Sequence, residues 1–295
     1  DADDTRAVES IRRWAGMFYL GAVVYDSPFY AMLMPDSSRF SAAAAALHGV
    51  HGEDTFEPYR RIVAQNDFGA PSPLLACMAG ALTHYAADVT MHPLVSYFCN
   101  GSEASELRHR AFETCLDLYT VAGAGVPERV ASGMKRLIAA PELIQVARAL
   151  VPFYTPDESI HHSEVERVIH RHAWIRDRFD AAVWKRLLRL YGHVAGRSGE
   201  VLAATWYPPR SEGTAALEPL RGFFSRPIDY RHPRTGETRS LSAEGHFALA
   251  AELACKLIRA FERGSLGSDG PGLSLDAGCD IHRYPEERYT GFASP

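Results

Sequence analysis

Histidine and acidic residues recur at four-residue intervals in one stretch of the sequence, and this spacing suits metal binding. His84, Asp88 and His92 are each four positions apart, and His109 and Glu113 repeat the interval after a short polar break. On an α-helix, residues four apart lie on one face, about 6 Å apart along the axis. His84 and His92 are then about 12 Å apart, too far for one zinc ion with bonds of about 2.0–2.2 Å. The spacing therefore indicates two or more metal ions, with Asp88 as a shared carboxylate.

The setting of these residues favours metal binding over a solvated helix face. The stretch over residues 74–91 is apolar on nearly every side, so we expect a buried helix there. Ionisable side chains rarely occupy such a helix unless they are paired or bound to a metal. Its many alanine and glycine residues allow neighbouring backbones to approach closely. Pro93 follows His92 directly and lacks a backbone donor, so we expect the helix to kink or stop there.

Two stretches nearer the N-terminus supply further candidate ligands. An amphipathic and then apolar helix over residues 5–24 leads to Asp26, which precedes a Ser-Pro turn. This carboxylate either caps the turn or reaches the centre of the molecule. An alanine-rich helix then ends at His48, where Gly49 favours a helix stop. His51 follows closely, and the residue types alone leave open which of the two histidines binds a metal.

The order of these segments resembles the bacterial zinc-dependent phospholipase C family. The resemblance rests on GAVVYDSPFY, ALHGVHGEDTF, GALTHYAADVTMHPLV and HRAFE, all within residues 14–120. It implies an all-α fold and a metal-dependent hydrolase that cleaves a phospholipid or another phosphodiester at a site for up to three zinc ions. The metal ligands that it implies are Asp26, His48, His84 and Asp88 for one zinc, and His92, His109 and Glu113 for a second, with Asp88 and Glu113 shared by a third.

The sequence departs from the family pattern at one position. The family supplies another histidine near the N-terminus, and no histidine precedes His48 here. We therefore expect two zinc ions, and a third only if water or a further N-terminal ligand completes its coordination. We prefer His48 to His51 because His48 ends a helix, which fixes its direction, and because it fits the family order. Asp26 is the candidate catalytic residue, since it could bind zinc and also orient or deprotonate the attacking water.

The rest of the sequence predicts helices in the same domain. We expect one mainly helical domain over residues 1–295, with a metal-binding core in 14–120 and a helical, loop-rich part in 121–295. Residues 196–241 are rich in Gly, Pro, Ser and Arg and predict a long irregular excursion with one short hairpin. A clear helix then begins after Ser242 and stops at Gly264.

A second histidine row has the same spacing as the first but a different setting. His162, Glu166 and His170 are also four residues apart. They lie among charged residues, beside an apolar stripe that includes Val165 and Val168. We therefore interpret this row as the solvated flank of a helix, with a position at the rim of a pocket as the alternative.

Composition limits the partners. The formal net charge of −5 provides no global basic field, so we expect no nucleic-acid partner. No apolar run reaches about 18 residues, so no transmembrane span is expected, although a phospholipid substrate implies peripheral membrane contact.

The sequence begins at Asp1 without Met, which leaves a leader and the cell compartment open. Two alternatives remain: another hydrolase on the same scaffold, such as a nuclease, and a non-catalytic, metal-stabilised lipid-binding protein.

Overall fold

The computed structural model describes residues 5–31, 34, 37–99, 105–123, 139–155, 159–179, 187 and 222–289. Within these ranges the chain is mostly helical, which confirms the predicted fold class. The helices are α1 (Arg6–Arg13), α2 (Ala15–Val24), α3 (Ser37–His48), α4 (Glu57–Gln65), α5 (Pro73–Cys99), α6 (Ser105–Gly123), α8 (Leu143–Ala149), α9 (Val151–Tyr154), α10 (His162–Phe179) and α14 (Ala243–Glu262), with a short 3-10 helix, η1 (Ser27–Ala31), after α2. The assignment of the whole chain to one domain stays a prediction.

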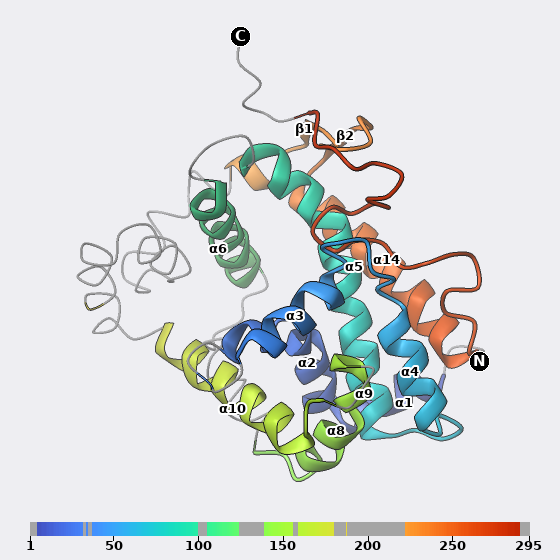
Figure 1. Cartoon of the computed structure of the whole chain (residues 1–295). Coiled ribbons are helices and arrows are strands. Elements are labelled where there is room, and N and C mark those ends of the chain that lie inside the picture. Colours follow the sequence, from blue (N-terminus) through green and yellow to red (C-terminus); the bar gives the residue numbers. More distant parts are fainter. Residues whose placement is uncertain are drawn as a thin grey trace.

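Helix α5 is the element along which α1, α2 and α14 pack (Figure 1). Because its residues are apolar on nearly every side, it is buried along most of its length. Helices α3, α6 and α10 lie to the left of α5 in Figure 1, and α14 lies to its right. No helix in the described ranges is long and apolar enough to cross a membrane.

Two glycines allow α2 and α5 to pack backbone against backbone. A Cβ atom on Gly21 would lie 1.8 Å from the carbonyl oxygen of Cys77, and one on Gly80 would lie 1.9 Å from that of Phe18. No side chain fits at either position. This contact brings the end of α2, and with it Asp26, against the middle of α5.

The contact can be tested with the change Gly80→Ala. We expect this methyl group to force α2 away from α5 and to lower the free energy of unfolding by about 1–3 kcal/mol or more, as overpacked cores do. Urea unfolding followed by circular dichroism measures this effect. The control is Gly222→Ala, at an exposed site with no atom within 4 Å of the added methyl group. Equal stability of the two variants would show that the close approach of the helices is not required.

The structure corrects two expected helix boundaries. The helix predicted over residues 5–24 is interrupted at Trp14, whose backbone is not helical. Of the two outcomes expected at Pro93, a kink or a stop, the stop is wrong, because helix α5 continues to Cys99. Proline removes the donor for the carbonyl four residues earlier, that of Val89. The residues before and after Pro93 are buried, and their packing holds α5 together without this hydrogen bond.

Other boundaries follow the sequence. Helix α3 ends at His48, and Gly49 adopts the left-handed conformation with φ +64°. The predicted hairpin is the antiparallel pair β1 (Ile228–Arg231) and β2 (Thr238–Leu241). The part of the predicted excursion over residues 196–221 lies outside the described residues. Ser242 caps α14 by accepting a hydrogen bond from the Gly245 backbone N–H at 3.2 Å.

Candidate metal centre

One group of candidate ligands combines Asp26, His48 and His84 from three different elements. Their nearest ligand atoms all lie within 4.8 Å of one another. Oδ1 of Asp26 is 3.4 Å from Nε2 of His48 and 3.8 Å from Nε2 of His84. Ligand atoms at the corners of a zinc tetrahedron with bonds of about 2.1 Å are about 3.4 Å apart. The observed separations therefore suit a shared zinc ion.

Backbone carbonyl groups hold both imidazoles of this group in one orientation. Nδ1 of His48 donates to the Ala44 carbonyl at 2.8 Å, and Nδ1 of His84 donates to the Ala22 carbonyl at 3.0 Å. A carbonyl can only accept, so each ring carries a proton on Nδ1 and presents Nε2 to the centre. Such outer hydrogen bonds are typical of histidines that bind metals.

A second group combines His92 from α5 with His109 and Glu113 from α6. One carboxylate oxygen, Oε1 of Glu113, lies 2.9 Å from Nε2 of His109 and 3.4 Å from Nε2 of His92. The other oxygen accepts a hydrogen bond from Arg110 at 3.0 Å. Nδ1 of His92 donates to the Leu275 carbonyl at 2.9 Å, so its Nε2 also faces the centre.

Asp88 lies between the two groups but outside both sets of mutually close ligand atoms. Its Oδ2 is 3.0 Å from Nε2 of His84, yet that nitrogen is buried and has no hydrogen-bond partner among the described residues. This close approach of an imidazole nitrogen and a carboxylate oxygen suits a common cation. The charge of Asp88 also acts on His92 in the second group. The expected position of Asp88 within reach of both groups therefore agrees with its surroundings.

The carboxylates of the site require nearby positive charge. Burial alone would lower the pKa of His84, but Asp88 and Asp26 raise it to about 9. Burial likewise opposes the charged form of His92, and Asp88 and Glu113 raise its pKa to about 10. Burial would raise the pKa of Glu113, but its hydrogen bonds from the histidines hold this pKa well below its usual range. Without a metal, the histidines supply the positive charge.

This charge balance predicts proton release when zinc binds. Both His84 and His92 have a pKa above 7, so both are protonated at pH 7 in the metal-free protein. Zinc must displace these protons, and we expect about two to leave when both groups fill at pH 7. Apparent zinc affinity should therefore rise as the pH increases from 7 to 9. A pH-indicator titration of chelator-treated protein with zinc measures the release, and binding without any release would contradict the assignment.

The other histidine candidates are separated from the centre. His51 is exposed, whereas His48 is only 3% exposed. The structure thus places His48, and not His51, beside Asp26. In the second row, His170 is half-exposed and lies 3.7 Å from Glu166, outside both ligand groups. These positions agree with the interpretation of that row as a helix flank.

Sequence reasoning missed two side chains on α10. His172 is buried, contacts Ser27 at 3.0 Å and stacks on Tyr30 with ring centroids 3.8 Å apart. Arg176 follows one turn later, and both residues line the same cavity as the ligand groups. A signal was present, because His172 extends the apolar stripe of Val165 and Val168 by one more helical turn.

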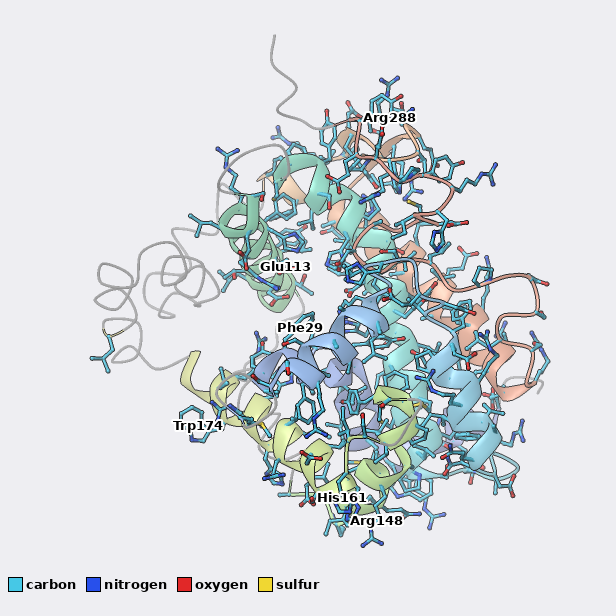
Figure 2. The ribbon with its side chains drawn as sticks, viewed as in Figure 1. Phe29, Glu113, Arg148, His161, Trp174 and Arg288 are labelled. Atoms are coloured by element: carbon cyan, nitrogen blue, oxygen red, sulfur yellow. The ribbon has the colours of Figure 1, made fainter. Side chains whose placement is uncertain are left out.

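Members of both ligand groups line one cavity with a volume of about 830 Å³: Asp26 and His48 of the first group, and all three residues of the second. Figure 2 shows two of its lining residues on facing elements, Glu113 on α6 and Phe29 beside α3. Basic lining side chains include Arg110 and Arg176. Apolar side chains also face the cavity, among them Val23, Phe29, Met91, Val95, Leu116 and Phe247. The cavity can therefore accept an anionic group that carries an apolar substituent.

The residues present fit zinc. Each group offers imidazole nitrogen and carboxylate oxygen, which are common zinc ligands. The separations suit one coordination sphere in each group, and the buried Nε2 of His84 lacks any other described partner. Sequence reasoning also missed Asp276, whose Oδ1 lies 3.9 Å from Nδ1 of His92, on the side of the ring that faces away from the ligand group.

A family model described as zinc-dependent phospholipase C matches residues 3–186, more than half of the chain. The matched range contains all the candidate ligands proposed from the sequence. No similar protein is found among curated proteins, and no similar solved structure is found.

Proposed function

The chain belongs to the zinc-dependent phospholipase C family, and from this premise we propose that it hydrolyses the phosphodiester bond of a phospholipid. Family membership supports a zinc-dependent hydrolase. The observation that carries the proposal is the shared cavity, in which two sets of zinc-type ligands face both basic and apolar side chains.

We assign one zinc ion to each ligand group. Asp26, His48 and His84, joined by Asp88, would hold the first, and His92, His109 and Glu113 would hold the second. Zinc in such sites acts as a Lewis acid on phosphoryl oxygens and lowers the pKa of a water molecule to about 7. A third ion shared by Asp88 and Glu113 would need a further ligand.

Asp26 is the proposed catalytic carboxylate. Its side chain is 45% exposed although it lies close to His48 and His84, so an oxygen remains open to the cavity. Its partial burial would raise its pKa, but His84 and His48 hold this pKa well below its usual range. The carboxylate is therefore ionised at neutral pH and can accept a hydrogen bond or a proton from the attacking water.

Two arginines of the cavity are suited to the phosphate of the substrate. Arg110 is fixed by its hydrogen bond to Glu113, and Arg176 lies on α10. Guanidinium groups bind phosphoryl oxygens strongly because they offer paired donors. Phe29, which is 42% exposed at the cavity, would contact the apolar part of a lipid. This arrangement supports contact with a membrane surface.

Metal analysis combined with an activity assay tests the function. We expect elemental analysis of the purified protein to find about two equivalents of zinc. Hydrolysis of a chromogenic phosphocholine diester should stop after chelation and return when zinc is added. Stable zinc content without turnover of any phosphodiester would instead favour the non-catalytic, lipid-binding alternative.

A further inference from the structure

We infer that residues 272–282 are an integral part of the metal centre and couple its two ligand groups. This inference rests on the proposal that both groups bind zinc. The segment lies beyond the family-matched range of residues 3–186. Through the backbone of a single residue, Leu275, it bonds to one ligand residue of each group. The Leu275 N–H donates to the His48 carbonyl at 2.8 Å, and the Leu275 carbonyl accepts from Nδ1 of His92 at 2.9 Å.

Each of these two bonds acts on a ligand in a different way. The bond to His92 fixes the tautomer and the direction of the ring, so that Nε2 points toward Glu113. The bond to His48 satisfies a carbonyl at the end of α3, where the helix provides no donor. It thereby holds the helix end that carries His48. A displacement of Leu275 would disturb both ligands together.

The segment is itself held firmly around Leu275. The Leu275 side chain is fully buried. Before it, the Leu273 N–H donates to the Tyr85 hydroxyl at 2.9 Å. After it, the Gly278 N–H donates to the Ser274 carbonyl at 2.8 Å and closes a turn. Leu275 therefore cannot shift freely within this arrangement.

At Gly278 the turn packs directly against α5, next to His92. Its φ angle is +62°, and a Cβ atom there would lie 2.5 Å from both the Val89 carbonyl oxygen and Cγ of Pro93. Val89 is the residue whose carbonyl loses its helical donor at Pro93. The proline and the glycine thus meet at the point where the segment touches the metal-bearing helix. Only a residue without a side chain allows this contact.

The change Gly278→Ala tests the inference, with Gly264→Ala as a matched control. Both glycines have a left-handed backbone, with φ angles of +62° and +68°, so both substitutions strain the chain locally. At Gly264, however, no atom lies within 4 Å of the added methyl group. A difference between the two variants therefore reports the displacement of the segment rather than backbone strain. Far-UV circular dichroism first establishes that each full-length variant is folded.

Zinc affinity is then measured separately for each group by competition with a chromophoric chelator. The background His109→Ala leaves only the first group, and the background His84→Ala leaves only the second. We expect Gly278→Ala to weaken zinc binding about 10–100-fold in both backgrounds, the range for lost outer-shell contacts. Gly264→Ala should leave both affinities unchanged. Weakening in the His84→Ala background alone, or equal effects of the two glycine variants, would overturn the coupling.

A milder variant covers the case in which Gly278→Ala does not fold. Ser274→Ala removes the hydroxyl that accepts from the Ala277 N–H at 3.3 Å and so loosens the same turn. We expect a smaller loss of zinc affinity in both backgrounds, and unchanged affinity in either would overturn the inference. If the unsubstituted protein binds no zinc, the proposed function itself fails. If it binds zinc normally and the segment variants do as well, only the role of the segment fails.

Discussion

The change Asp88→Asn should remove most phosphodiester hydrolysis and lower the zinc content. Asp88 lies within 3.0 Å of His84, and its charge also acts on His92 in the other group. Asparagine keeps the shape and one carbonyl oxygen but removes the negative charge and the ability to bridge. We expect zinc affinity to fall by about 10²-fold or more and the hydrolysis rate to fall with it. Elemental analysis and the chromogenic assay measure the two effects on the same preparation.

A control separates this role from a structural one. Glu166→Gln changes the acid of the second histidine row, where Glu166 faces His170 near solvent at 3.7 Å. It should leave zinc content and turnover nearly unchanged. If Asp88 were only a buried structural acid, Asp88→Asn would lower stability while activity per folded molecule remained. If Glu166→Gln lost zinc and Asp88→Asn retained it, the assignment of the metal site to α5 would be wrong.

The part of the site that could be predicted lies on regular helices. The four-residue spacing fixes which face of α5 carries His84, Asp88 and His92, and the apolar surroundings of that helix make it a buried one. Gly49 marks the end of α3, and this places His48 at a helix terminus. Helix spacing and helix-stop residues depend on positions only a few residues apart, so they can be recognised from the sequence alone.

The unpredicted part depends on contacts between distant segments. Leu275 bonds to His92 through its backbone, and a backbone carbonyl has no residue type by which it can be recognised. His172 is buried although the nearby His170 is half-exposed, and this difference depends on the packing of α10 against η1 and α8. The continuation of α5 through Pro93 depends on tertiary packing, which overrides a local rule.

The change Asp26→Asn should remove most hydrolysis while the second ligand group keeps its zinc. We propose Asp26 as a ligand of the first group only, so we expect the second group to retain its zinc. Hydrolysis should nevertheless fall about 10²–10⁴-fold, the usual contribution of a general base. The fold should survive, because the backbone carbonyl of Asp26, which accepts from the Phe29 N–H at 3.0 Å, is unchanged.

The pH profile and a matched control complete this test. The pKa of Asp26 is held well below its usual range, so its carboxylate is ionised throughout the range in which the protein can be assayed. We therefore expect any acid limb of the wild-type profile to come from protonation of the proposed histidine ligands, whose raised pKa values make zinc binding weaker as the pH falls. The control Asp67→Asn alters an exposed turn aspartate that accepts from the Gly69 N–H at 2.7 Å. If Asp26→Asn behaved like this control, with hydrolysis intact, Asp26 would be only the turn residue that its Ser-Pro context also allows.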